Sequence, residues 1–252
     1  MRASLLLAIV FALGACTPDP RVSVPASPTA AAIGTVTLGL SNVHVLYGAH
    51  PVLVDTGSPD EFDDLEEELG DIGVKLADVK CAVVTHVHAD HAGNARELQK
   101  HGIKIIAGAG DVARARAGDH GTLYPTSFFA RFILRPVIPN HFAPFTPDVQ
   151  VRDHYDLTEC GVPAEVIVMP GHTAGSLVVL ARGGTIALVG DLFRGGTFAG
   201  YVDREQPEEH FYQDDLAMAH RRIHELLARG VELFVLGHGG PSQRDAVARA
   251  FP

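Results

Sequence analysis

Three histidines and an aspartate fall within six consecutive positions, just after an apolar stretch, Val79–Val84, that is typical of a buried strand. They are His86, His88, Asp90 and His91. Imidazole nitrogens and a carboxylate suit zinc or iron, and side chains that alternate where a strand opens into a loop can converge on one pocket. An ordinary loop has no need of three histidines so close together. The run therefore predicts a metal site at the end of a strand.

Three further polar residues follow apolar runs at positions where strands are expected to end, and each lies beside a glycine that lets the backbone turn tightly. They are His172, Asp191 and His238, which follow Val166–Met169, Ile186–Val189 and Leu233–Leu236. Five histidines and two aspartates are thus expected to meet at one rim. Seven ligands exceed what one tetrahedral zinc needs, and a carboxylate can bridge, so two ions are the economical count.

The His-x-His-x-Asp-His run, followed by these three positions in order, resembles the metallo-β-lactamase superfamily. The similarity spans roughly residues 34 to 241 and includes Val54-Asp55-Thr56-Gly57 near its start. It implies a metal-dependent hydrolase with two divalent ions. The ligands implied for the first ion are His86, His88 and His172, those for the second are Asp90, His91 and His238, and the bridging ligand is Asp191.

Strand-like and helix-like spacings of apolar residues alternate in both halves of the chain. The first half predicts strands at 35–38, 43–47, 52–54, 79–84 and 103–107, and helices at 59–69, 92–100 and 111–117. The second half predicts strands at 165–169, 176–181, 185–189 and 232–236, and a helix at 214–229. This order favours an α/β domain with two sheets face to face and helices on both outer sides. The resemblance implies that it is a four-layer αββα metallo-β-lactamase-like sandwich.

One domain, residues 33–252, accounts for the length, because about 237 residues remain once a leader is removed. The formal net charge is −10, and the sequence has no cluster of Lys or Arg. A nucleic-acid surface would need a basic stripe to neutralise phosphates. We therefore expect a small-molecule substrate and no nucleic-acid partner, and the sequence leaves the oligomeric state open.

The amino terminus has the pattern of an export signal, with an apolar stretch at 5–13 that is too short to span a bilayer. Residues 1–15 are expected to be a signal peptide. Leu13-Gly14-Ala15-Cys16 resembles a bacterial lipobox, which implies lipidation of Cys16, with plain secretion as the alternative. Residues 16–32, rich in Pro, Ala and Ser, are expected to be a flexible tether or a disordered end. The protein is thus expected in the periplasm, anchored to the membrane by lipid.

Two other cysteines, Cys81 and Cys160, are the candidates for an internal disulfide. Cys81 lies in the strand before the metal motif, where a small apolar side chain packs well without a partner. An oxidising compartment allows the two to pair but does not require it. No disulfide is therefore predicted.

Residues 119–145, between the two halves, carry six aromatic side chains and four prolines. The aromatic residues are Tyr124, Phe128, Phe129, Phe132, Phe142 and Phe145. The segment is a candidate substrate-facing flap, and packing of its aromatic rings onto the domain is an equally good interpretation. Arg194 and Tyr201, which follow Asp191, are candidates to orient an anionic or carbonyl-bearing substrate, with a salt bridge as the alternative for the arginine.

The expected chemistry follows from the metal. A divalent ion lowers the pKa of a bound water toward about 7, so hydroxide is available at neutral pH, and a second ion can polarise the carbonyl under attack. We expect hydrolysis of an ester, thioester or lactone carbonyl, with zinc as the metal and Asp90 passing a proton to the leaving group. Asp55, Thr85 and Thr173 are expected to orient ligands and loops.

The resemblance leaves other activities open. β-Lactamases share the expected periplasmic location, although they generally lack an aspartate at the position of Asp191. Persulfide dioxygenases of the same superfamily share the Thr-His-x-His-Ala-Asp-His run, and their single iron would here be held by His86, His172 and Asp191. A lipid-tethered binding protein that keeps the metal cage without turnover is the third alternative.

Overall fold

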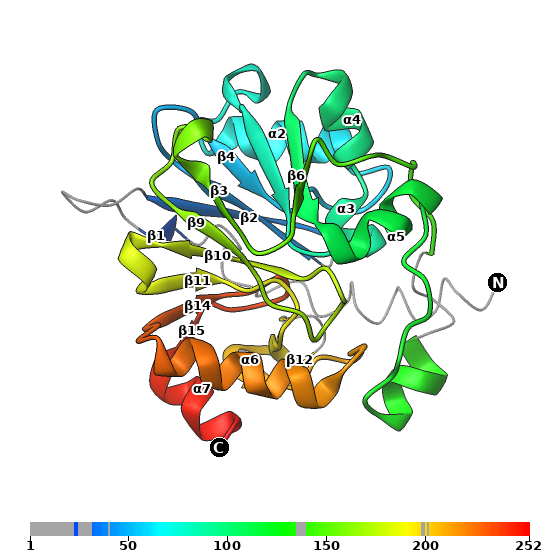
Figure 1. Cartoon of the computed structure of the whole chain (residues 1–252), viewed down its shortest axis with the longest axis vertical. Coiled ribbons are helices and arrows are strands. Elements are labelled where there is room, and N and C mark those ends of the chain that lie inside the picture. Colours follow the sequence, from blue (N-terminus) through cyan, green and yellow to red (C-terminus); the bar gives the residue numbers. More distant parts are fainter. Residues whose placement is uncertain (1–22, 25–31, 40, 135–139, 198–199, 201) are drawn as a thin grey trace.

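Two β-sheets lie face to face in the computed structural model, and helices cover the outer side of each (Figure 1). The structure describes residues 23–24, 32–39, 41–134, 140–197, 200 and 202–252. The first sheet contains, in spatial order, β1 (Ser23–Val24), β2 (Ile33–Leu38), β3 (Ser41–Leu46), β4 (Val52–Val54), β5 (Cys81–Val84), β6 (Lys104–Gly108) and β7 (Val149–Val151). The second contains β15 (Ser242–Gln243), β14 (Leu233–Val235), β11 (Ile186–Leu188), β10 (Leu177–Ala181), β9 (Glu165–Val168) and β8 (His154–Asp156). A separate hairpin joins β12 (Arg194–Thr197) to β13 (Val202–Glu208).

The helices form the two outer layers (Figure 1). On the first sheet lie α2 (Phe62–Asp71), α3 (Ala89–Ala92), α4 (Ala95–Lys100) and α5 (Val112–Ala117), and on the second lie α6 (Leu216–Ala228) and α7 (Arg244–Ala250). Single helical turns occur at Leu76–Asp78, Ala109–Asp111, Leu157–Cys160 and Arg182–Gly184, and a short π-helix at Ala130–Leu134. The predicted four-layer αββα sandwich with a single domain is therefore confirmed.

Side chains of β5 alternate between two apolar layers. Cys81 and Val83 face the second sheet, whereas Ala82 and Val84 pack against the helices of the first, and all four are fully buried. The strand pairs in parallel with β4 and β6 and is covered on both faces, which explains why its sequence is a continuous apolar run. Each buried valine contributes about 1.5–3 kcal/mol relative to an exposed one. This burial fixes the strand that ends at the histidine-rich run.

Parallel pairing decides where the polar residues emerge. β4, β5 and β6 are parallel to one another, and β11 is parallel to β14. The carboxyl ends of parallel strands meet at one edge of a sheet. The residues that follow these strands, among them Asp55, Asp111 and Asp191, therefore come to a common rim between the two sheets.

Two buried polar side chains of β3 tie the first sheet to the second half of the chain. The amide of Asn42 donates to the carbonyls of Leu236 and Gly239, both at 2.9 Å. Burial lowers the pKa of His44 to about 4. This neutral ring therefore donates through Nε2 to Leu236 O at 3.1 Å. These bonds hold the loop that follows β14 against the edge of the first sheet.

Several elements were not predicted, because their sequences lack an apolar period. β13 is the clearest case, since its residues Val-Asp-Arg-Glu-Gln-Pro-Glu are mostly polar and only one is buried. It forms because it pairs with β12. β7, β8, β15 and α7 are also short and depend on their neighbours in the sheet or the outer layer.

The two internal cysteines form a disulfide, contrary to the sequence-based expectation. Cys81 in β5 bonds to Cys160 in the turn after β8, across 79 residues of sequence, with 5.8 Å between their Cα atoms. Both side chains are buried in the layer between the sheets. The bond was missed because only the packing of one sheet on the other brings these positions together.

The expected signal peptide over residues 1–15, Cys16 and most of the expected tether lie outside the described residues. Within residues 16–32, Ser23 and Val24 pair with Gly34 and Ile33 as β1. Among the described residues, every helix falls short of the length and hydrophobicity that a membrane span requires.

We predict that the double substitution Cys81→Ala/Cys160→Ala lowers the free energy of unfolding by about 2–4 kcal/mol, because the cross-link closes a long loop and restricts the unfolded chain. Urea titration of both proteins would measure the difference. Wild-type protein treated with reductant is the matched control and should lose a similar amount. An unchanged urea midpoint in the double variant would contradict the prediction.

Candidate metal centre

All seven predicted ligands lie together at the common rim. Among the described residues, four groups of three have donor atoms within 4.8 Å of one another. They are His86/His88/His172, His86/His91/Asp191, Asp90/His91/His238 and His172/Asp191/His210. Residues from both halves of the chain therefore converge on one cluster, as the sequence predicts.

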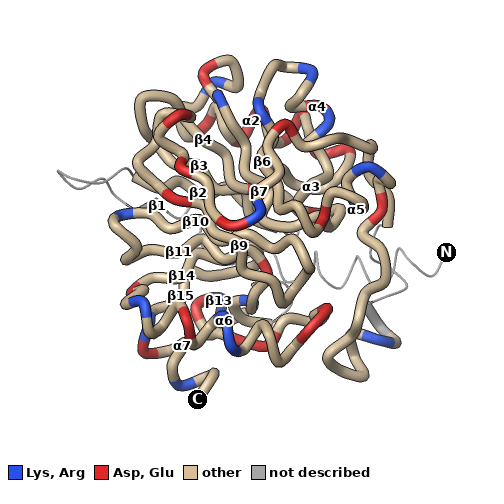
Figure 2. Tube along the Cα trace, viewed as in Figure 1, with Lys and Arg blue, Asp and Glu red and all other residues tan. Residues whose placement is uncertain are grey.

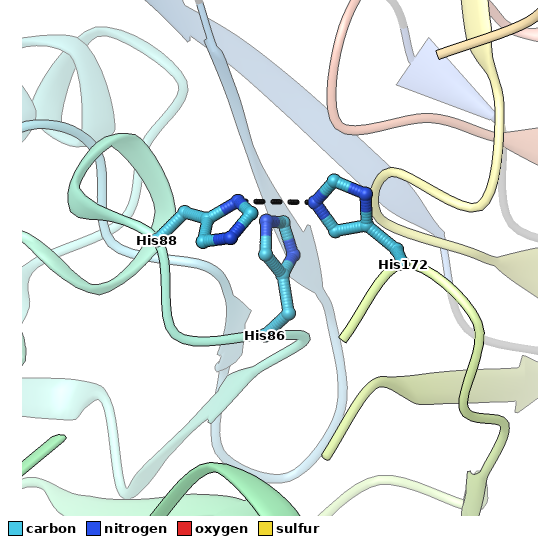
Figure 3. A group of neighbouring side chains, drawn as sticks. All are labelled: His86, His88 and His172. Atoms are coloured by element: carbon cyan, nitrogen blue, oxygen red, sulfur yellow. Dashed lines mark hydrogen bonds between the residues drawn. The ribbon is translucent and has the colours of Figure 1, made fainter. Parts of the chain in front are cut away.

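The first group consists of His86 after β5, His88 before α3 and His172 in the loop between β9 and β10. Figure 3 shows the three rings pointing toward one another, with Nε2 of His172 3.0 Å from Nδ1 of His88. The Nε2 atoms of His86 and His88 are buried and have no hydrogen-bond partner among the described residues. Because an unpaired buried polar atom is costly, these atoms fit a bound cation.

The second group has the spacing of donors around a metal ion. Nε2 of His91 lies 3.4 Å from Oδ2 of Asp90 and 3.3 Å from Nε2 of His238, and the His238–Asp90 distance is 3.3 Å. Zinc binds nitrogen at about 2.0–2.1 Å, so neighbouring donors of a tetrahedral site are about 3.3–3.4 Å apart. The three side chains therefore fit one face of such a site.

Asp191 lies between the two groups and is 3% exposed. Its Oδ2 atom is within 3.7 Å of the Nε2 atoms of five histidines. The distances are 3.6 Å to His86, 3.3 Å to His91, 3.7 Å to His172, 3.1 Å to His210 and 3.2 Å to His238. Its other oxygen, Oδ1, is buried and has no hydrogen-bond partner among the described residues. A carboxylate in this position could bridge two ions.

Two glycines allow the loops around this carboxylate to pack closely. Gly190 has a φ of +53°, and a Cβ atom there would lie 2.6 Å from Oγ1 of Thr85. A Cβ atom on Gly237 would lie 2.2 Å from Oδ1 of Asp191. Any other residue at either position would displace the loops that carry the site.

Asp55 orients His91, a member of the second group, through a hydrogen bond to its ring. Its carboxylate accepts hydrogen bonds from Nδ1 of His91 at 2.9 Å and from the backbone amide of Thr85 at 2.7 Å. The hydroxyl of Thr85 also donates to it at 2.9 Å. An outer carboxylate of this kind fixes the orientation of a ligand histidine, which is the role that the sequence predicts for Asp55 and Thr85.

Asp111 supports the first group through the loops that carry it rather than through a ligand ring, and it was not predicted. It is 1% exposed and accepts from the amide of Val87 at 3.1 Å, the hydroxyl of Thr173 at 2.6 Å and the amide of Gly175 at 3.1 Å. It thus clamps together the loops that carry His88 and His172. Its position after β6, like that of Asp55 after β4, is the signal that could have identified it.

Burial lowers the pKa of His86 and His88 well below the usual value and that of His172 to about 3, so these rings are neutral. Burial also disfavours the charged forms of His91 and His238. The Asp191 and Asp90 carboxylates nevertheless raise the pKa of His91 well above its usual value and that of His238 to about 10. In the metal-free protein, His86, His88 and His172 therefore offer nitrogen lone pairs, whereas His91 and His238 carry protons.

His210 belongs to the cluster but was not predicted. It follows β13, a strand that the sequence does not reveal, and is 6% exposed. No apolar run or glycine beside it marks the end of a strand, so the signal that identified His172, Asp191 and His238 is missing here.

Arg194 is buried rather than on the surface. Its guanidinium pairs with Glu208, donates to the carbonyl of Gly196, and lies 4.2 Å above the ring of Phe211. Its expected role in substrate binding stays a prediction. Tyr201, the other candidate, lies outside the described residues.

The aromatic segment at 119–145 divides into two parts. Phe142 and Phe145 are buried in the core of the first half, which fits the packing interpretation. The other four aromatic residues, Tyr124, Phe128, Phe129 and Phe132, are exposed. A cavity of about 330 Å³ beside them is lined by Leu123, Pro125, Arg131 and Tyr212.

The cavity is connected to the cluster through Tyr212. The carbonyl oxygen of Tyr212 lies 2.9 Å from Nδ1 of His172 and 3.0 Å from Nδ1 of His210, while its hydroxyl donates to Ala130 O at 2.7 Å. One residue, Tyr212, thus contacts both the cavity and the histidine cluster.

Comparison with known proteins gives a family match over most of the chain. The model of the Metallo-beta-lactamase superfamily matches residues 36–238. Metallo-beta-lactamase domain-containing protein 1 of Xenopus laevis is 28% identical over 205 residues, which cover 79% of this chain and 71% of that protein. A probable metallo-hydrolase of Methanocaldococcus jannaschii is 28% identical over 141 residues, covering 56% of this chain and 62% of that protein, less than two thirds of its length.

Solved structures are similar in fold. A metallo-beta-lactamase family protein of Thermus thermophilus superposes with a TM-score of 0.60 and 22% identity, covering 86% of this chain and 76% of that chain. The similarity at this identity concerns the fold alone.

We predict that zinc binding to the metal-free protein near pH 7 releases protons, because an ion must displace those on His91 and His238. The pKa of His238, about 10, lies above this pH, so its ring is protonated beforehand. Affinity should fall about tenfold per released proton when the pH is lowered by one unit. Calorimetric titration in buffers of different ionisation enthalpy counts the protons. Zinc affinity that does not change between about pH 6 and 8 would contradict this.

Proposed function

The chain belongs to the metallo-β-lactamase superfamily and is a metal-dependent hydrolase, and we propose that it hydrolyses an ester, thioester or lactone at a centre of two divalent ions. Zinc suits the donor set best, since five of the seven predicted donors are imidazoles. His86, His88 and His172 would hold one ion, Asp90, His91 and His238 would hold the other, and Asp191 would bridge.

The observation that carries this proposal is the arrangement of two three-residue groups on either side of one buried carboxylate. A single iron held by His86, His172 and Asp191 would leave the remaining four predicted ligands beside it without a metal to bind. Those four include the Asp90/His91/His238 group, whose donors already have the spacing of a metal face. The number and spacing of the donors therefore support a centre of two ions, and metal analysis separates it from a single iron.

Asp90 is the proposed catalytic residue. Its side chain is 33% exposed, whereas those of His91 and Asp191 are 0% and 2% exposed. It is thus the carboxylate of the cluster that solvent and substrate can reach. Bound divalent ions would lower the pKa of water toward about 7 and polarise a carbonyl. Asp90 would pass a proton to the leaving group.

The charges on the described surface and the cavity near the cluster support a small amphipathic substrate. Along the described trace, Lys and Arg are scattered among acidic residues and form no continuous basic stripe in Figure 2. Among the described residues, the cavity is lined by Leu123, Pro125, Tyr212 and the cation Arg131. An apolar chain could lie along these walls while an anionic group pairs with the arginine.

We further propose that the protein is exported to the periplasm and tethered by lipid at Cys16, as the amino-terminal pattern indicates. The Cys81–Cys160 disulfide supports this, because such bonds persist in oxidising compartments.

His88→Ala should lower the metal content of the purified protein and reduce hydrolysis at least about 100-fold, because a donor of the first group is lost. Elemental analysis measures the first effect, and rates on the best substrate measure the second. His101→Ala is the matched control, since that imidazole is exposed and outside the cluster. A fully loaded and fully active His88→Ala protein would contradict the ligand assignment.

A substrate panel separates the remaining activities. We expect two zinc ions per chain and turnover of lactones, esters or thioesters, with faster rates for longer acyl chains. One iron per chain with oxygen uptake on a persulfide would instead establish the dioxygenase, and turnover of β-lactams alone would establish a β-lactamase. Turnover of phosphodiesters only would overturn the acyl-transfer proposal while leaving the metal centre intact.

A further inference from the structure

His210 comes from a part of the chain that contributes none of the seven predicted ligands. It follows the β12–β13 hairpin, and its backbone carbonyl accepts from the hydroxyl of Thr126 at 2.7 Å. Its Nε2 atom reaches Oδ2 of Asp191 at 3.1 Å, the shortest of the five histidine contacts to that oxygen. The residue is therefore anchored at its backbone and directed into the cluster through its ring.

One carbonyl group orients both His210 and His172. The oxygen of Tyr212 lies 3.0 Å from Nδ1 of His210 and 2.9 Å from Nδ1 of His172. The amide nitrogen of Tyr212 is farther from the His210 ring, at 3.3 Å. With Nδ1–H donating to the same carbonyl, both rings present the Nε2 lone pair to the cluster. Ligand histidines are typically held in this way, with the second nitrogen donating to a backbone carbonyl.

In this tautomer the Nε2 lone pair of His210 faces the carboxylate of Asp191. A metal ion bound to both atoms, which lie 3.1 Å apart, would offset the repulsion between these two acceptors. Donors of His172, Asp191 and His210 are all within 4.8 Å of one another, which is close enough to share one ion. The ring of His210 also lies 4.7 Å from that of His172, at right angles to it.

We propose that His210 is an eighth ligand of the metal centre and binds the ion held by His172 and Asp191. The proposal rests on the dinuclear centre described above and extends it. An extra imidazole raises the affinity for borderline-soft ions such as zinc over magnesium or calcium. It also adds a second connection between the metal site and the 210–213 segment, since the carbonyl of Tyr212 already contacts Nδ1 of His172.

The test compares His210→Gln with His210→Ala in protein freed of metal and reloaded. Glutamine can still donate a hydrogen bond to Asp191 but is a poor zinc ligand, so it separates ligation from hydrogen bonding. We expect both variants to bind zinc at least about tenfold more weakly in competition with a chromophoric chelator. We also expect both to change the ligand-field absorption of the cobalt-substituted protein. These readouts do not depend on knowing the substrate.

His120→Ala is the matched control. His120 is buried, and its ring lies 5.6 Å from that of His88, but its two nitrogens already contact Gly121 O and Asn140 Oδ1. Its loss should leave the cobalt spectrum unchanged. Wild-type zinc affinity and an unchanged cobalt spectrum in a folded His210→Gln protein would overturn the proposal. If His88→Ala still loses metal in that case, the dinuclear centre stands and only the role of His210 fails.

Discussion

The buried carboxylate of Asp191 is the constraint on which the rest of the structure depends. Five imidazole nitrogens lie within 3.7 Å of one of its oxygens, and the residue is 3% exposed. A buried carboxylate without compensating charge costs several kcal/mol, so the fold must supply protons or metal ions around it. Protonated His91 and His238 do so in the metal-free protein, since their pKa values are raised. Metal binding would replace these protons with metal ions, so positive charge lies next to Asp191 both before and after binding.

Assembling this environment requires both sheets, because no single segment carries enough donors. Asn42 connects the first sheet to the loop that carries His238. Asp111 connects the loops of His88 and His172, which come from different halves of the chain. Each of these bonds is buried, and breaking one would leave a polar atom without a partner. The hydrogen bonds that join the halves are thus the same bonds that position the ligands.

The sequence predicts the buried strands and the residues at their ends, because both depend on local pattern. Continuous apolar runs identify β5 and β11, and a glycine beside Asp191 or His238 marks the loops that follow. Contacts that arise only from packing are not predictable in this way. The Cys81–Cys160 bond spans 79 residues, and Asp111 looks like any helix-starting aspartate until the 173–175 loop is packed against it. His210 was missed because the strand before it has no apolar period.

Tyr212 links the chemistry of the site to the cavity through three different groups. Its carbonyl orients two imidazoles, its hydroxyl donates to Ala130, and its side chain lines the cavity beside the exposed aromatic residues. The strand-end ligands are fixed by fully buried strands, whereas residues 123–130 are attached to residues 210–213 by hydrogen bonds and by a small apolar cluster of Leu123, Ala130 and Tyr212. A change in that segment can therefore reach the ligand rings through a single residue. If the cavity holds part of the substrate, as proposed, sequence variation in this segment would alter substrate preference more than metal binding, because it changes the cavity wall directly and the carbonyl of Tyr212 only through the backbone.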